Sequence, residues 1–420
     1  MSTRILCLFI ALALMGGSGC SGGGSSDPAN VSVAGVTLNK SSTSILVNGS
    51  EQLTASVVPD NATEKGVTWI SAVPAIVDVD QNGVITPKTI GSVTITVTTV
   101  DGAKTAACVV TVTNKISYKL TGGSSFKELI TPVIMDGSVF PTLPDDSVDA
   151  SVPARFAMAD TETTYQLWKE VYTWATDSAR GSNVYTFAHA GQNGSDASGN
   201  GLNTSVSVQY PVTMVSWRDV MIWCNALTEY YNAVYGTARA CVYCTDTIYG
   251  TPIRSVNTGT TITTTAGTED NPCVNSAAKG FRLPSSNEYE FASRYIGLSA
   301  PSSTNVKIRN GVYYTSGESA SGATDVWTNF AATGIVAIYN LATGTALVRT
   351  RNSNALGFYD LSGNVAEWCF DWYPGSSNSR VYRGGTWCDA VANVLRVGFA
   401  SSSNPYNENY ITGFRFMRTL

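Results

Sequence analysis

Between residues 30 and 114, apolar and polar residues alternate in short runs that are rich in Val, Ile and Thr. Turn-forming pairs separate these runs, among them Asn82-Gly83 and Asp101-Gly102. Alternation of this kind predicts strands with one buried face, and many short strands in succession predict an all-β sandwich. Trp69 is the expected core aromatic residue, and Cys108, within an alternating strand, is expected to be a small core residue.

Beyond residue 115 the sequence shows helical periodicity in three places. Between Glu162 and Thr176, apolar side chains recur at helical spacing and form one face. Two further helices are expected to begin at capping boxes, Ser216 with Asp219 and Ser285 with Glu288. The apolar positions expected to be buried in the first two helices are Tyr165, Trp168, Val171, Ala175, Val220, Trp223, Cys224 and Leu227. Elsewhere Gly, Asn and Ser are frequent, so we expect an α+β domain with much irregular backbone.

The N-terminus carries the pattern of an export signal. Arg4 precedes an apolar run from residue 5 to residue 15, which is shorter than the roughly 20 residues that span a bilayer. Small residues then lead into Cys20, as in a bacterial lipoprotein signal. We therefore expect residues 1–19 to be a signal peptide, Cys20 to carry a lipid and residues 20–30 to form a Gly/Ser tether. The expected location is the bacterial cell envelope, lipid-anchored at the outer-membrane surface; plain secretion is the alternative.

The amino-acid composition argues against several classes of function. Lys and Arg number 26 against 31 Asp and Glu, a net charge of −5, so a nucleic-acid partner held by counterion release is not expected. Charged residues make up 14% and apolar residues 43%, far from the composition of a disordered chain. A single histidine, His189, excludes metal sites that need several imidazoles, and we expect it to be a loop or packing residue.

Seven cysteines lie beyond the expected signal peptide and Cys20. Cys241 and Cys244 have CxxC spacing, but no second such pair and no paired histidines accompany them, so a zinc site is not expected. Export permits disulfides, and we expect Cys273 to pair with one of these two across a loop.

The strand-rich segment carries the runs Val67-Thr-Trp69, Ala75-Ile-Val77, Gly83-Val-Ile-Thr86 and Gly91-Ser-Val-Thr-Ile95. These runs resemble the bacterial Ig-like domains of group 2, and the resemblance covers nearly all of residues 31–114. It implies a spacer or an adhesion module, because the segment holds no titratable cluster.

Five motifs follow one another in the rest of the chain. They are Tyr210-Pro-Val-Thr-Met-Val-Ser-Trp217, Gly280-Phe-Arg-Leu-Pro284, Leu361-Ser-Gly-Asn-Val-Ala-Glu-Trp368, Arg383-Gly-Gly-Thr-Trp387 and Gly413-Phe-Arg415. Together they resemble the formylglycine-generating enzyme (sulfatase-modifying factor) family. The resemblance covers residues 150–420 and implies a modified C-type lectin fold, with residues 115–149 as a linker leading into it. The family includes copper-dependent oxidases, iron-dependent sulfoxide synthases and non-catalytic binding proteins.

Oxidases of this family use two cysteines that bind copper as thiolates. By the resemblance, those positions are Asp389 and Val394 here, and Cys388 lies one place out of register. The sulfoxide synthases need several histidines, and the chain has only His189. A catalytic role and a copper cofactor are therefore not expected. A formylglycine-generating oxidase with an altered site stays the alternative.

A structural calcium site of the family is matched by Asp360, Gly363, Val365 and Glu367, where two carboxylates flank a Gly-centred turn. Carboxylate and carbonyl oxygens are the ligands that calcium prefers. The resemblance therefore implies a structural calcium ion here. The alternative is that Asp360 and Glu367 form salt bridges or cap the turn.

Residues 388–412 differ in composition from the rest of the chain: Asn, Ser, Tyr and Phe are frequent, and Lys, Gln, Met and Trp are absent. The segment resembles the variable region of surface lipoproteins that are diversified by retroelements on the same fold. Tyr, Ser and Asn on a loop also form antibody-like binding surfaces. The residues expected to face a ligand are Cys388, Asp389, Ala390, Val391, Asn393, Val394, Phe399, Ser401, Ser402, Ser403, Tyr406, Asn407, Asn409 and Tyr410. The residues expected to support them are Trp387, Leu395, Arg396, Val397, Pro405 and Phe414.

The sequence thus predicts a lipid-anchored, non-catalytic receptor or adhesin that binds a protein or glycan ligand. Three alternatives stay open: an ordinary polar loop on a degenerate enzyme fold, an altered oxidase, and a purely structural envelope protein. The residue types of the C-terminal segment indicate what kinds of contact it makes with a ligand, and they do not identify the ligand.

Overall fold

The computed structural model describes residues 30–46, 50–89, 91–113, 115–119, 125–130, 138–142, 145–152, 156–195, 209–297, 300–303 and 305–420. The expected signal peptide and Cys20 lie outside these residues, as does all of the expected tether except residue 30. Within the described part of the chain, no helix combines the length and apolar character needed to cross a bilayer.

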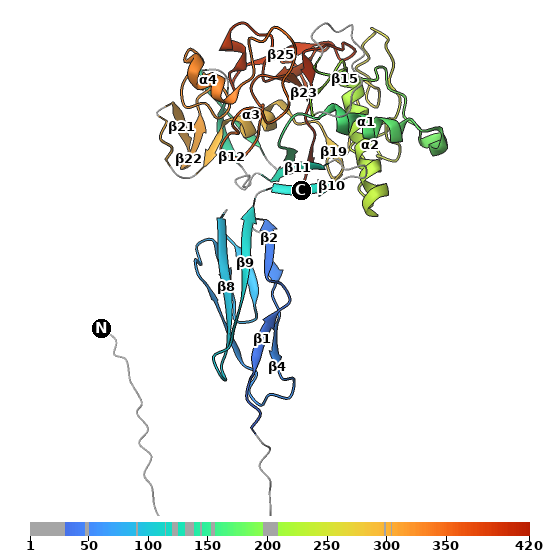
Figure 1. Ribbon diagram of the computed structural model, residues 1–420. Coiled ribbons are helices and arrows are strands. Elements are labelled where there is room, and N and C mark those ends of the chain that lie inside the picture. Colours follow the sequence, from blue (N-terminus) through green and yellow to red (C-terminus); the bar gives the residue numbers. More distant parts are fainter. Residues whose placement is uncertain are drawn as a thin grey trace, which may run out of the picture.

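The N-terminal body is a β-sandwich, as predicted (Figure 1). Its strands are β1 (Gly35–Leu38), β2 (Ser42–Leu46), β3 (Glu51–Gln52), β4 (Ala55–Val58), β5 (Val67–Ser71), β6 (Val77–Val79), β7 (Val84–Pro87), β8 (Gly91–Thr99) and β9 (Thr105–Thr113). One sheet has the order β2-β9-β8-β5, a second has the order β3-β7-β6, and β1 pairs with β4. Trp69 and Cys108 lie in the buried core of this sandwich, which confirms both expectations.

A five-stranded sheet with the order β10-β11-β14-β27-β19 lies on the side of the C-terminal domain nearer the sandwich (Figure 1). Its strands are β10 (Lys115–Lys119), β11 (Ser125–Ile130), β14 (Phe156–Ala159), β19 (Phe281–Arg282) and β27 (Met417–Thr419). Every residue of β14 is buried, because Phe156 and Met158 join one core cluster and Ala159 joins another.

The stretch 115–149, expected to be a linker, contributes more than a connection. It supplies β10 and β11 to the main sheet, and the hairpin of β12 (Ser138–Thr142) with β13 (Val148–Val152) begins within it. A two-stranded ribbon is marginal alone, and β11 gains its second neighbour only at β14. That distant partner leaves no local pattern in the sequence.

The three predicted helices are present as α1 (Tyr165–Ala175), α2 (Trp217–Tyr235) and α3 (Ser286–Arg294), and both capping boxes form. α1 begins at Tyr165 instead of Glu162, because Thr164 is its N-cap. All eight apolar positions expected to be buried in α1 and α2 are buried. Trp168 and Trp223 stack with ring centroids 5.7 Å apart. The short α4 (Phe330–Val336) was not predicted, because its seven residues give too brief a periodic pattern.

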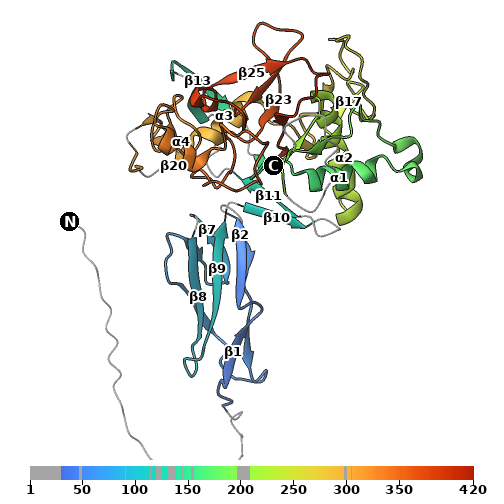
Figure 2. The same ribbon diagram turned by 45° about the horizontal axis from the view of Figure 1, so that its top comes forward.

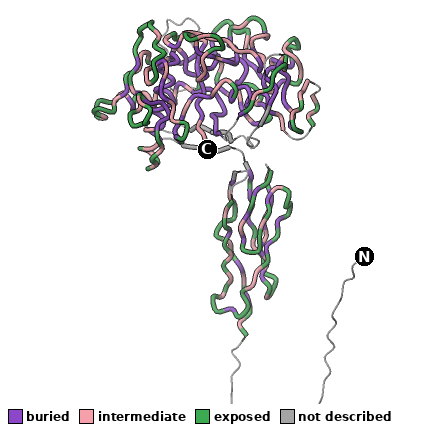
Figure 3. The backbone as a smooth tube through the Cα atoms, turned by 180° about the vertical axis from the view of Figure 1, so that it is seen from behind, coloured by how far each residue is buried: buried purple, intermediate pink, exposed green. Residues whose placement is uncertain are grey.

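A four-stranded sheet with the order β25-β24-β23-β26 lies farther from the sandwich (Figures 1 and 2). Its strands are β23 (Ala366–Trp372), β24 (Arg380–Arg383), β25 (Ala400–Ser403) and β26 (Thr412–Gly413). The smaller elements are η2 (Ser178–Asn183), β15 (Gln192–Asn193), β16 (Val212–Thr213), β17 (Tyr243–Cys244), β18 (Cys273–Val274), β20 (Tyr295–Gly297), β21 (Val306–Arg309), β22 (Val312–Thr315) and η3 (Ala392–Leu395). Buried residues fill the interior of this domain, and exposed segments lie at its rim (Figure 3).

The described cysteines are all free thiols, so the expected disulfide of Cys273 is not formed in the structure. Cys244 and Cys273 lie opposite each other in the β17–β18 pair. The buried Cys241 thiol instead contacts the main-chain oxygen of Asn225 at 3.6 Å.

Candidate binding surface

The C-terminal segment, residues 387–412, crosses the side of the domain that carries β25, away from the sandwich (Figure 2). It includes η3 and β25. Residues 404–411, which follow β25, are called the C-terminal loop below. None of the fourteen residues expected to face a ligand is buried. The exposed ones are Cys388, Ala390, Val391, Asn407 and Asn409, and the others are half-buried.

Most of the residues expected to support the segment do lie beneath it. The buried ones are Trp387, Leu395, Val397, Pro405 and Phe414. The exception is Arg396, which is half-buried and reaches Glu318 with two bonds of 2.8 and 3.0 Å.

The domain holds this segment largely through the segment's main chain. The amides of Asn340 and Leu341 donate to the carbonyl oxygens of Asp389 (3.0 Å) and Trp387 (2.8 Å). Four more donors reach main-chain oxygens: Ser362 Oγ to Leu395 (2.8 Å), Arg218 N to Pro405 (3.2 Å), Met214 N to Asn409 (2.9 Å) and Ala366 N to Ile411 (2.9 Å). β25 also pairs along its length with β24. Main-chain bonds do not depend on which side chain a position carries.

Arg383, from the fourth sequence motif, is the main side-chain contributor to this anchoring. Its Nη1 donates to the carbonyl oxygens of Val397 (3.1 Å) and Phe399 (3.2 Å). Its Nη2 binds Glu290 at 2.7 Å and its Nε binds Ser286 Oγ at 2.8 Å. The motif singled out Arg383, but its role follows only from contacts that are distant in sequence.

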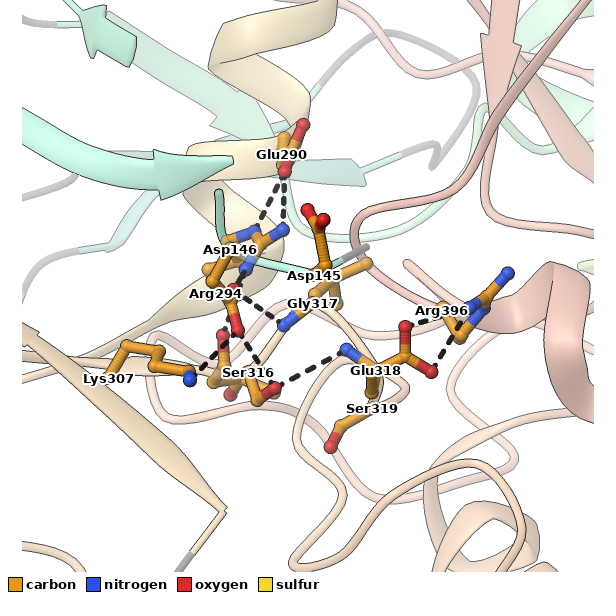
Figure 4. Close-up of polar contacts among 12 residues, drawn as sticks. Asp145, Asp146, Glu290, Arg294, Lys307, Ser316, Gly317, Glu318, Ser319 and Arg396 are labelled. Carbon is orange, nitrogen blue, oxygen red and sulfur yellow. Dashed lines mark hydrogen bonds and ion pairs between the residues drawn. The ribbon is translucent and has the colours of Figure 1, made fainter. Parts of the chain in front are cut away.

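A network of charged side chains lies behind the segment (Figure 4). The buried Arg294 of α3 lies between Glu290 and Asp146 and binds both. Close by, Glu318 binds Arg396 of the C-terminal segment. Removing one member of the buried Arg294–Asp146 pair would leave an uncompensated charge. Asp146 also accepts from the amide of Gly317 at 2.8 Å, so the pair fixes α3 against the loop that carries Glu318.

The two positions that the resemblance matches to the cysteines of the oxidases carry other groups here. The carboxylate of Asp389 accepts from the main-chain amide (2.6 Å) and the hydroxyl (2.9 Å) of Thr386, and Val394 lies half-buried in η3. Cys388 is the one exposed cysteine among the described residues. Burial raises the pKa of the Cys369 thiol well above its ordinary value. The described chain therefore offers one accessible thiol, whereas the copper site that the resemblance implies needs two thiolates.

The four positions matched to calcium lie around a buried turn. Gly363 has a φ of +85°, and a Cβ atom there would lie 2.2 Å from the carbonyl oxygen of Ile338. Only glycine fits this turn, because it adopts positive φ at low cost and has no Cβ.

The two carboxylates of this turn have different partners. The buried Arg415 binds both oxygens of Glu367 at 2.6 Å. One oxygen of Asp360 accepts from the amide of Arg349 at 2.8 Å, and its Oδ1 has no hydrogen-bond partner. Burial, together with the charges of Asp360 and Glu367, raises the pKa of the nearby buried Glu162 well above its ordinary value.

These contacts do not fit the expected calcium shell. The guanidinium of Arg415 already pairs with both oxygens of Glu367, which is one of the four expected ligands. The alternative of a salt bridge is what the geometry supports for Glu367.

Two family matches account for this architecture. Residues 131–420, more than half of the chain, match the sulfatase-modifying factor enzyme 1-like domain, and residues 32–110 match the bacterial Ig-like domain of group 2. The chain belongs to the sulfatase-modifying factor family and carries an Ig-like domain before the family domain. The predicted fold class is confirmed: α+β, with a formylglycine-generating-enzyme-like form of the C-type lectin fold after an all-β sandwich.

Individual relatives match shorter stretches. A formylglycine-generating enzyme from Streptomyces coelicolor is 34% identical over 88 residues, 17% of this chain and 28% of that enzyme. An uncharacterized protein of Clostridium acetobutylicum is 42% identical over 108 residues, 24% of this chain and 11% of that protein. The chain thus spans only 11% and 28% of the length of these two curated relatives. Among solved structures, Treponema denticola variable protein 1 is similar at a TM-score of 0.49 and 22% identity, covering 73% of this chain and 99% of that one.

Proposed function

We propose that this protein is a lipid-anchored surface protein of the bacterial envelope, and that it binds a protein or glycan ligand without catalysis through its C-terminal segment. The observation that carries the proposal is that, within residues 387–412, the main chain and the side chains have different roles. Their main chain is bound by the scaffold, and none of the fourteen candidate side chains is buried. Because the scaffold holds the main chain independently of the side chains, substitutions in this segment can change which ligand is bound and leave the path of the backbone unchanged.

The chemistry of these side chains suits recognition. Tyr406 and Tyr410 supply large contact areas at low entropic cost, and Ser401, Ser402 and Asn407 supply adaptable hydrogen bonds. The ring of Tyr406 lies 5.7 Å from the guanidinium of Arg218, which supports the ring from below. The segment lies on the side of the domain away from the Ig-like sandwich (Figure 2), an arrangement that suits a spacer carrying a receptor domain.

A diversified surface predicts a specific pattern in the DNA. A near-copy of the segment's coding sequence should lie close to the gene, beside a reverse-transcriptase gene, and differences should be confined to adenines of the copy. AAC or AAT codons are expected in the copy at many displayed positions, including Cys388, Phe399, Ser402 and Tyr406. Little change is expected at the supporting positions Trp387, Arg396, Pro405 and Glu408.

Sequencing the complete genome of the source organism checks this prediction. These four positions are the internal control, because they share the segment but contact the scaffold: Trp387 and Pro405 are buried, Arg396 binds Glu318 and Glu408 binds His189. A genome without the repeat and the reverse transcriptase would leave a binder of fixed specificity.

The exposed thiol of Cys388, one place from a catalytic position, favours the oxidase as the second candidate. We expect the copper-loaded protein to form no formylglycine in a cysteine-containing sulfatase-type peptide under oxygen, because Asp389 and Val394 supply no thiolate. Mass spectrometry of the peptide measures the aldehyde, with the Streptomyces coelicolor enzyme as positive control and Cys388→Ser as matched variant. Multiple turnovers that Cys388→Ser abolishes would establish the oxidase instead.

A further inference from the structure

The single histidine of the chain lies between the scaffold and the C-terminal loop. The Nδ1 atom of His189 lies 2.7 Å from Oδ2 of Asp219, at the N-terminus of α2. Its Nε2 atom lies 3.2 Å from Oε2 of Glu408, in the loop. The imidazole thus spans two carboxylates, one fixed and one on the candidate binding surface.

Asp219 determines which ring nitrogen carries the proton of the neutral imidazole. Its side chain is buried and accepts from the amides of Ala188 (2.7 Å) and His189 (3.2 Å) and from the amide (3.1 Å) and hydroxyl (2.6 Å) of Ser216. A carboxylate surrounded by donors requires Nδ1 to donate as well. The neutral ring then has no hydrogen on Nε2, and that nitrogen faces the acceptor oxygen of Glu408.

A second proton changes this contact. Protonation at Nε2 creates an N–H group and a positive charge, so the ring can donate to Glu408 while it still donates to Asp219. We propose that His189 is a positioning residue of the binding surface. The doubly protonated ring donates from Nε2 to Glu408, a contact that we call the clasp, and so fixes the C-terminal loop. Loss of the Nε2 proton breaks this contact and releases the loop. This inference rests on the proposed function, because the loop carries four of the candidate residues: Tyr406, Asn407, Asn409 and Tyr410.

The groups around the ring give the sign of the pH dependence. Asp219 of α2 and Glu408 of the loop act on the ring directly, and the charge of Asp219 contributes to raising the pKa of Tyr172 of α1. The hydrogen bond to Asp219, followed by the two carboxylate charges, raises the pKa of His189 above its ordinary value of 6.5, although burial opposes the shift. A raised imidazole pKa means that the clasp is complete below pH 6.5 and is lost as pH rises through the raised value.

Two measurements on the full chain test the proposal, and neither needs a ligand. With a purification tag that contains no histidine, the one imidazole gives a single Hε1 signal in NMR, whose shift against pH reports the His189 pKa directly. We expect Glu408→Gln to lower this pKa, and Asp389→Asn, which removes a charge from the same segment, to leave it nearly unchanged. Equal pKa values in the wild type and Glu408→Gln would overturn the proposal.

The second measurement follows the loop itself. Amide hydrogen exchange over residues 404–411, corrected for the intrinsic pH dependence of exchange, should show about two- to fivefold more protection at pH 6 than at pH 9, as suits a half-exposed ion pair. This difference should vanish in His189→Gln and in Glu408→Gln. Wild-type protection that is independent of pH, or a difference that persists in both variants, would contradict the clasp. Failure of either result leaves the ligand-binding proposal standing, because that proposal rests on the main-chain anchoring.

Discussion

Replacing Arg415 with methionine is expected to lower the free energy of unfolding by about 3–5 kcal/mol, the usual cost of leaving a buried charge without its partner. Arg415 is fully buried and neutralises Glu367 through two bonds of 2.6 Å. It also donates to the carbonyl oxygens of Ala159 (3.1 Å) and Tyr359 (3.0 Å). The substitution therefore leaves the Glu367 carboxylate without its cationic partner and removes the donor from the main-chain oxygens of Ala159 and Tyr359. Urea denaturation followed by circular dichroism measures the change.

Two comparisons make this prediction specific. Arg309→Met breaks an ion pair with Asp149 in which both side chains are about a third or more exposed, and it should cost less than about 1 kcal/mol. In the wild type, a calcium chelator should leave the melting temperature unchanged, because Arg415 already supplies the charge opposite Glu367. A large drop with the chelator, reversed by added calcium, would restore the ion to this turn and contradict our assignment.

The substitution Arg383→Met is expected to cost about 2–3 kcal/mol and to loosen the segment it supports. The side chain bridges Glu290 and the carbonyl oxygens of Val397 and Phe399. Glu290 keeps Arg294 as a partner, so the cost should fall below that of Arg415→Met. Loss of the two main-chain contacts should raise amide exchange around residues 396–400 more than elsewhere.

The matched control for this variant lies in the same segment. Arg396→Met removes an ion pair with the more exposed Glu318, so a cost of about 1 kcal/mol or less is expected. Denaturant midpoints and exchange rates of the two variants, measured side by side, separate anchoring by Arg383 from a general sensitivity of the segment. Equal costs would argue against a special role for Arg383.

Sequence patterns predicted those elements whose determining residues lie close together along the chain. The helical face of Tyr165, Trp168 and Val171 and the capping box at Ser216 are short-range signals, and the structure contains both. β10 and β11 were missed, because their place in the sheet depends on β14, which lies well downstream. The same limit applies to Asp146 and Arg294, which are 148 positions apart and meet only after folding.

The candidate site shows the limit of motif matching. Glu367 and Arg415 belong to two recognised motifs, and each motif was interpreted separately, one as a metal site and the other as a family marker. Their contact at 2.6 Å depends on β26 pairing in parallel with β23, which no motif encodes. That none of the displayed residues is buried was easier to anticipate, because most of them are small or polar side chains, and these tend to face water.

The position of β27 has a consequence for how the protein is made. β27 lies between β14 and β19, and its Arg418 is paired with Ala157, 261 positions earlier. The Ig-like sandwich contains all of its own partners within residues 35–113, so it can fold as soon as it is synthesised. The second domain cannot complete its sheet before β27 is made, since β27 is the strand that joins β14 to β19. An interrupted translation product would thus carry a folded Ig-like domain and an unfolded second domain, and unfolded chain is what proteases cleave most readily.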